Sequence, residues 1–337
     1  MTRNDEKGYA LLALLLVLFV SGSSLMINTM NNRQSSATQA QLELARELTL
    51  AKESLLAYAA NSASLNQNTR GPGFFPCPDM NSSDGNPTPA ATCNADVPLV
   101  GRLPEYVDLA TSRYRFSDKY SGIDEQFWLI VAPRYVYHST NDDSQRRSNR
   151  RTHRTETYAA PFRMHLDGGG DYVAFLIAPG AALPTQDREG GPDNYANYLD
   201  GQNGASNFDF FSSYDVNPEA FNDHIIGITH NEYMVTVGTT VARQIMEGLE
   251  NYHSIYSSYP PSSSVNTTFE SQFNSNLTWL RRSTLGNGER WADTPNNVTW
   301  VRYADNDQGD LRFAGCSGIT WFVNKDANTL TRSGANC

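Results

Sequence analysis

An apolar segment near the start of the chain constrains the fold more than any other feature. Twelve consecutive apolar residues, Tyr9–Val20, follow a leader of eight residues, and no glycine or proline occurs between Ile27 and Gly71. Residues 34–63 are rich in Ala, Leu, Glu, Gln and Lys, which favour helices. Apolar side chains recur there at helical spacing, at Leu44, Leu48, Ala51, Leu55 and Tyr58. The pattern predicts one helix over residues 9–62, apolar in its first half and amphipathic in its second.

The apolar run allows three interpretations. A secretory signal would be cut near Gly22–Ser24, after a short apolar stretch. A membrane helix needs about 20 apolar residues, and the run reaches that length when it is extended to Ile27. In the third interpretation the run is the first half of a long working helix. The uninterrupted helical pattern that follows favours the third, because a cleaved signal peptide does not explain it.

The residues around the start of the run carry a family resemblance. Lys7 and Gly8 precede an apolar run that begins with the aromatic Tyr9. This arrangement resembles the type IV pilin and type II secretion pseudopilin family. The resemblance implies that a prepilin peptidase cleaves between Gly8 and Tyr9 and that Tyr9 is then methylated. Major subunits of the family usually carry Glu at the fifth mature position, where this chain has Ala13, so the departure favours a minor subunit.

A second resemblance extends along the chain. The blocks "AKESLLAYAAN", "FFPCPD", "GRLP", "VAFLIAPGAAL" with "YLDGQN", and "FNDHIIGIT" look like blocks of large minor-pilin-like proteins of Gram-negative bacteria. It implies an α+β, pilin-like fold: a long N-terminal helix, membrane-spanning in its first half, packed on an antiparallel β-sheet headpiece with large loop insertions. The expected parts are a leader (1–8), a spine helix (9–62, with 9–27 transmembrane) and a headpiece (63–337) with sub-domains near 63–217 and 218–337.

The function implied by these resemblances is structural. We expect a non-catalytic minor pilin or pseudopilin that contributes to the assembly or tip of a type IV pilus or type II secretion pseudopilus. Its expected partners are other pilins through the N-terminal helix, the prepilin peptidase, and the inner membrane before assembly. The expected location is a single pass of the inner membrane with a periplasmic headpiece, then a cell-surface or periplasmic filament. Two alternatives stay open: a membrane-anchored periplasmic binding protein or enzyme, and a filament-tip adhesin or DNA-binding subunit.

The four cysteines fall into two pairs in sequence, Cys77 with Cys93 and Cys316 with Cys337. Four cysteines allow three connectivities, and pairing of sequence neighbours is the simplest. Each loop closed in that way would stabilise the fold by roughly 3 kcal/mol in the chain-entropy model. An exported chain would form such disulfide bonds in an oxidising compartment.

Several elements of the headpiece can be predicted from local patterns. Residues 126–132 and 171–179 are short apolar runs that predict buried strands, and "DGGGD" at 167–171 predicts the turn before the second. Thr229 and Glu232 form a capping box that predicts a helix ending before Tyr259–Pro261. Short strand patterns after Asn266 predict an antiparallel sheet. The long polar stretch 180–222 is expected at the surface.

A basic segment between the two predicted strands is a candidate binding site. Its five arginines are Arg146, Arg147, Arg150, Arg151 and Arg154. Arginines so closely spaced could bind DNA phosphates or an acidic partner. The segment lacks interleaved aromatic residues that would stack on bases, and the net charge of the chain is −10. We therefore expect a solvated loop and do not expect nucleic acid as a partner.

The sequence carries no motif of a known catalytic type. It contains no G-x-S-x-G elbow, no phosphate loop and no H-E-x-x-H helix, so we expect no enzymatic activity and no obligatory cofactor. Calcium remains an alternative, because acidic turns could supply oxygen ligands. The candidate ligands are Asp305, Asp307 and Asp310, with a second acidic turn at Asp79 and Asp84. We expect ordinary Asx turns at both stretches, with calcium as the alternative.

Overall fold

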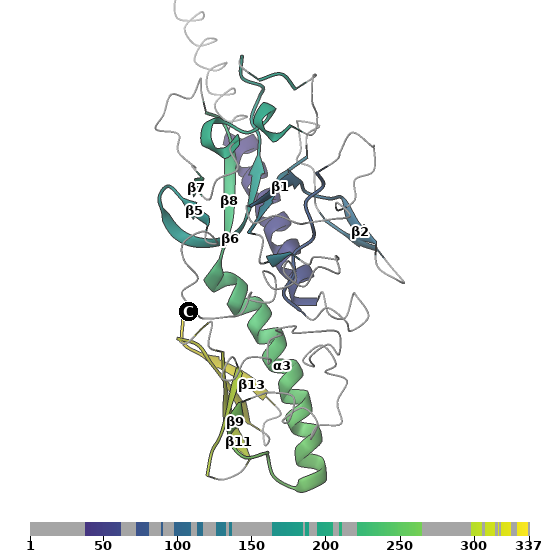
Figure 1. The fold of residues 1–337 in the computed structure, drawn as a ribbon, viewed down its shortest axis with the longest axis vertical. Coiled ribbons are helices and arrows are strands. Elements are labelled where there is room, and N and C mark those ends of the chain that lie inside the picture. Colours follow the sequence, from purple (N-terminus) through teal and green to yellow (C-terminus); the bar gives the residue numbers. More distant parts are fainter. Residues whose placement is uncertain are drawn as a thin grey trace, which may run out of the picture. The chain divides into compact units, whose positions relative to one another are not determined.

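The computed structural model describes residues 38–61, 72–80, 89, 98–108, 113–116, 126–132, 135–136, 164–184, 186–188, 194–204, 209–210, 221–264, 298–304, 307–313, 316, 318–324 and 329–335. By the density of its contacts the chain divides into two units. Of the described residues, 38–47 belong to the first unit and all others to the second. The second unit holds two larger sheets, a small hairpin and a long helix (Figure 1).

The first sheet has six strands in the order β1-β4-β6-β5-β7, and β8 also pairs with β6. The strands are β1 (Leu99–Arg102), β4 (Trp128–Val131), β5 (Met164–Leu166), β6 (Gly169–Ala178), β7 (Asp209–Phe210) and β8 (His224–Thr229). All pairs are antiparallel except β5 with β7. Every residue of β4 and the last six of β6 are buried, so the two apolar runs predicted as strands form the centre of this sheet.

A two-residue turn joins β5 to β6. Asp167 and Gly168 both have positive φ, 52° and 73°. This left-handed pair is typical of the type I′ hairpin turn, which matches the twist of antiparallel strands. The turn predicted from "DGGGD" is confirmed.

The long helix α3 (His230–Tyr256) follows β8 directly. Thr229 accepts a hydrogen bond from the backbone of Glu232, and the Glu232 side chain accepts one from the backbone of Thr229, which completes the predicted capping box. Ser257 ends the helix in the left-handed conformation. The apolar side chains of one face are buried: Val237, Val241, Ile245 and Leu249. The helix contacts β6 and β8 at one end and the second sheet along its length (Figure 1).

The second sheet is antiparallel, in the order β13-β12-β11-β10-β9. Its strands are β9 (Ser263–Ser264), β10 (Val298–Arg302), β11 (Gln308–Phe313), β12 (Thr320–Asn324) and β13 (Thr329–Ser333). Trp300 and Trp321 are fully buried, and Trp321 Nε1 donates to Thr239 Oγ1 of α3 at 3.1 Å. The predicted C-terminal antiparallel sheet is confirmed for β10, β11 and β12, whereas β9 and β13 were not predicted.

The predicted overall fold is wrong. It placed one long N-terminal helix on a single antiparallel headpiece sheet, whereas the described helical residues of that region are 38–61 and the described strands divide between two larger sheets and a separate hairpin. Within the second unit, residues 48–61 pack through Tyr58 on the rings of Tyr114 and Phe116, next to the hairpin β2 (Tyr106–Asp108) and β3 (Arg113–Arg115). The apolar stripe predicted for this segment is buried from Leu48 to Tyr58. The helical segment 48–61 does not, however, pack on one broad antiparallel sheet, as the predicted fold required.

The membrane predictions are also corrected. Of the helices in the described part of the chain, none combines the length and the apolar character that a membrane crossing requires. This finding contradicts the predicted transmembrane helix and the predicted single-pass inner-membrane location. Residues 9–27, on which those predictions depended, lie outside the described residues, as does the pilin-type processing site at Gly8 and Tyr9.

The structure describes only two of the four cysteines in the predicted pairs. Cys77 and Cys316 are buried, and neither has a free thiol. Their predicted partners, Cys93 and Cys337, lie outside the described residues. The structure therefore describes no bond between two of the four cysteines, and the pairing stays a prediction.

Candidate functional site

A buried pair of aspartates forms the most unusual polar site in the described residues. Asp200 and Asp223 expose 2% and 1% of their surface, and Asn203 beside them is fully buried. Asp200 lies between two short 3-10 helices, η4 (Tyr195–Asn197) and η5 (Gly201–Gly204), and Asp223 directly precedes β8. Charged side chains are rarely buried so completely unless they are paired.

The two aspartates bind each other's backbone. Asp223 Oδ2 accepts hydrogen bonds from Asp200 N at 2.8 Å and from Asn203 Nδ2 at 3.1 Å. In return, Asp200 Oδ2 accepts from Asn222 N at 2.6 Å and from Asp223 N at 3.1 Å. We call this reciprocal arrangement the aspartate clamp. It joins segments that lie more than twenty residues apart in the sequence.

A second layer of polar contacts surrounds the clamp. Gln186 Nε2 donates to Asp200 Oδ1 at 2.9 Å and to Tyr198 O at 3.1 Å. Arg188 donates to Gln186 Oε1 at 3.0 Å, and its guanidinium lies over the Tyr198 ring. The guanidinium of Arg102 in β1 also lies over two aromatic rings. Its central carbon is 4.8 Å from the centre of the Tyr198 ring and 5.3 Å from the centre of the Trp128 ring. These contacts fix Asp200 and Tyr198 against the first sheet.

The electrostatics of the pair are asymmetric. Burial, together with the charge of Asp200, raises the pKa of Asp223 to about 7, against the hydrogen bonds that favour its ionised form. Three of the four carboxylate oxygens of the pair accept hydrogen bonds. The fourth, Asp223 Oδ1, is buried and has no hydrogen-bond partner among the described residues. That oxygen is where a proton or another cation would be held.

The sequence did not reveal this site. Stretch 180–222 was predicted to lie at the surface, but Tyr198, Leu199, Asp200 and Asn203 from it are buried. The sequence offered only an Asp-Gly pair at 200–201 and an Asp before the apolar residues Ile225 and Ile226. Neither pattern says that the two carboxylates meet.

The predicted calcium ligands are engaged by protein groups. Asp307 Oδ1 lies 2.7 Å from His253 Nε2 of α3. Asp310 accepts from Tyr303 at 2.8 Å and from Arg312 at 2.9 Å. Among the described residues, no group of three or more His, Cys, Asp or Glu side chains is placed to hold a metal ion. Asp305 lies outside the described residues, and so does Asp84 of the second acidic turn; Asp79 of that turn is buried.

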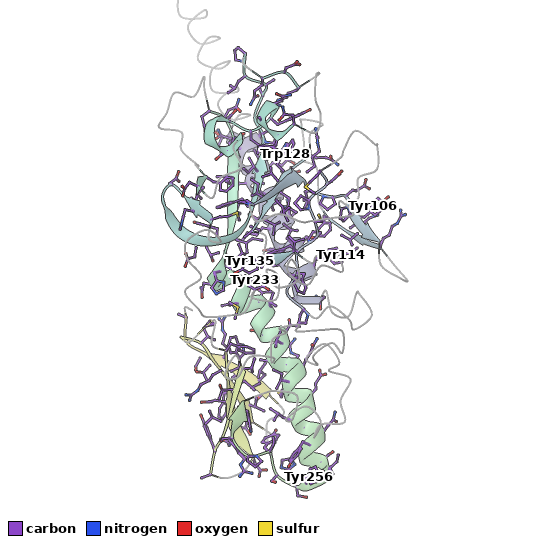
Figure 2. The ribbon with its side chains drawn as sticks, viewed as in Figure 1. Tyr106, Tyr114, Trp128, Tyr135, Tyr233 and Tyr256 are labelled. Atoms are coloured by element: carbon purple, nitrogen blue, oxygen red, sulfur yellow. The ribbon has the colours of Figure 1, made fainter. Side chains whose placement is uncertain are left out.

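The predicted basic segment cannot be placed. The five arginines of the basic segment (Arg146, Arg147, Arg150, Arg151 and Arg154) lie outside the described residues. Two histidines outside any predicted site are placed: His224 lies on β8, and His230 is the first residue of α3. His230 Nδ1 lies 3.1 Å from the hydroxyl of Tyr135, which also packs on Tyr233 (Figure 2).

No family model matches this chain, and it matches neither a curated protein nor a solved structure.

Proposed function

We propose that this chain is a non-catalytic subunit of a filament of the type IV pilin and pseudopilin class, of the minor type. The proposal rests on the processing pattern at Lys7, Gly8 and Tyr9 and on the surface of the helical residues 38–61. That helix is apolar on more than the face that packs inward. Leu42 is 66% exposed and Leu50 is 45% exposed, while Leu48 and Leu55 are buried.

The exposed leucines are the observation that carries the proposal. A helix that served only to cover its own domain would need one apolar face. Leu42 and Leu50, which the domain leaves exposed, are available to pack against another helix. In a filament built from parallel helices, each subunit buries such a face against its neighbours.

The buried face fixes the helix to the rest of the protein. Lys52 pairs with Glu232 at 2.6 Å, and Ser54 O accepts a hydrogen bond from Tyr114 at 3.0 Å. These contacts stabilise the orientation of residues 48–61 within the second unit. Leu50 is therefore presented by a rigid support.

Crosslinking from the exposed face tests the proposal. A photoreactive amino acid at position 50 of the full chain, expressed in the cell of origin, should crosslink to another subunit of the filament. Position 255 is the control, because Ile255 is also exposed, at 60%, but lies near the end of α3. Crosslinks of the same products from both positions, or none from position 50, would contradict the proposal.

A further inference from the structure

The aspartate clamp contains one buried oxygen that its hydrogen bonds do not satisfy. Both oxygens of Asp200 accept hydrogen bonds, from Gln186 and from the backbone of Asn222 and Asp223. Asp223 Oδ2 accepts two more. Asp223 Oδ1 accepts none from the described residues, although it is buried. An ionised carboxylate oxygen in such a position is costly, because burial removes its water without replacing it.

The charges that face Asp223 do not remove this cost. On the η4–η5 segment the nearest charged group is Asp200, which repels a second negative charge. On the 186–188 segment Arg188 attracts it, but its guanidinium is also engaged with Gln186 and the Tyr198 ring. On β8 the neighbouring titratable group is His224, whose pKa is lowered by burial, so that it is neutral near pH 7. Among the described residues, Asp200 and Asp223 thus share the positive charge of one side chain, Arg188.

We propose that the clamp is a proton-operated lock: Asp223 carries a proton on Oδ1 while the clamp is closed, and loss of that proton loosens residues 194–204 from residues 221–223. The site is well placed for this role. The raised pKa of Asp223, about 7, puts the change near neutral pH. The inference concerns the fold itself and does not depend on the proposed filament function.

The sign of the effect follows from linkage. The pKa of Asp223 is raised from 3.8 in an unfolded chain to about 7 in the fold. Its protonation therefore stabilises the closed clamp fully below the unfolded value, and this contribution is lost as the pH rises through about 7. Between these two pKa values each pH unit makes the loosened form about tenfold more populated relative to the closed form, and above about pH 7 neither form binds the proton, so the loss is complete.

Hydrogen exchange of the full chain tests the lock. After correction for the pH dependence of chemical exchange, protection of the amides of Asp200, Asn222 and Asp223 should fall about tenfold between about pH 5 and pH 6 and change little above about pH 7. The variant Asp223→Asn has no proton to lose and should show no such change. Asp209→Asn, at an exposed position of β7, should behave as wild type.

Three results would overturn the proposal. The first is protection in the wild type that does not change with pH, and the second is the same change in Asp223→Asn. The third is protection at pH 8 that is restored by added calcium ions, which would assign Asp223 Oδ1 to a metal. Because Asp223→Asn could fail to fold, the carboxyl resonance of Asp223 should also be titrated by NMR in wild-type protein. A midpoint near 4 in place of about 7 would equally contradict the lock.

Discussion

Lys52 Nζ lies 2.6 Å from Glu232 Oε1, and the same Glu232 carboxylate closes the capping box of α3. One side chain therefore links the helical segment 48–61 to the start of the longest helix of the second unit. Glu232 accepts from the backbone and hydroxyl of Thr229 through its other oxygen, at 2.9 and 3.1 Å. The ion pair and the cap share a carboxylate but use different atoms of it, so their contributions can be separated by mutation.

Glu232→Ala should destabilise the protein more than Lys52→Ala. The first change removes the ion pair and half of the capping box, and a lost cap costs about 1 kcal/mol. The second removes only a partly exposed ion pair, which contributes about 0.5 kcal/mol. Chemical denaturation of both variants measures the difference. Equal losses would mean that the cap contributes nothing beyond the ion pair.

The stability that Glu232 provides should be lost in acid. Burial acts to raise its pKa, but the hydrogen bonds from Lys52 and Thr229 together lower it below the ordinary value of 4.5. A lowered folded pKa stabilises the fold above the unfolded value and loses that effect as the pH falls through the folded one. Melting temperatures of wild type and Glu232→Gln should therefore converge below pH 4.5. A constant difference over the whole range would contradict this assignment.

Tyr233→Phe should cost about 1 kcal/mol of the free energy of unfolding. The hydroxyl of Tyr233 is buried and donates to Gly73 O at 2.7 Å, which fixes the chain between helix 38–61 and the first sheet to the start of α3. Burial raises the pKa of Tyr233 well above its usual value, so the hydroxyl keeps its proton at all working pH values. Tyr256→Phe is the matched control, because Tyr256 is exposed at the other end of α3 (Figure 2). An equal loss in both variants would contradict the role of the Gly73 contact.

Gly101→Ala should destabilise the protein by about 1–3 kcal/mol, as overpacking does. A Cβ at Gly101 would lie 2.5 Å from the backbone oxygen of Asp79, which is bonded to the adjacent Arg102. Backbone cannot rotate away as a side chain can. Gly169→Ala is the control, since a Cβ there meets its nearest atom at 3.9 Å. Equal melting temperatures for the two variants would show that β1 can move away from residue 79.

Local patterns predicted the local elements of this protein. The capping box of α3 and its end before Tyr259–Pro261 are decided by residues within or next to the helix, and both predictions were correct. The buried strands β4 and β6 followed from short apolar runs with flanking turns. In each case the deciding interactions lie within a few residues of one another, where a sequence pattern can record them.

The arrangement of those elements could not be predicted in the same way. The stripe from Leu48 to Tyr58 indicated that this helix packs inward, but its partners, Tyr114, Phe116 and Glu232, lie far along the chain. The aspartate clamp was missed for the same reason. Asp200 and Asp223 stand in a stretch whose polar composition predicts exposure, and only the fold brings them together.

The most direct test of the proposed function is the mass of the mature N-terminus in protein from the cell of origin. The account predicts that residues 1–8 are absent and that the chain begins at Tyr9 with one added methyl group. Intact-mass and N-terminal peptide measurements would show both changes. A chain that begins at Met1, or one that is cut near Ser24, would contradict the pilin-class assignment.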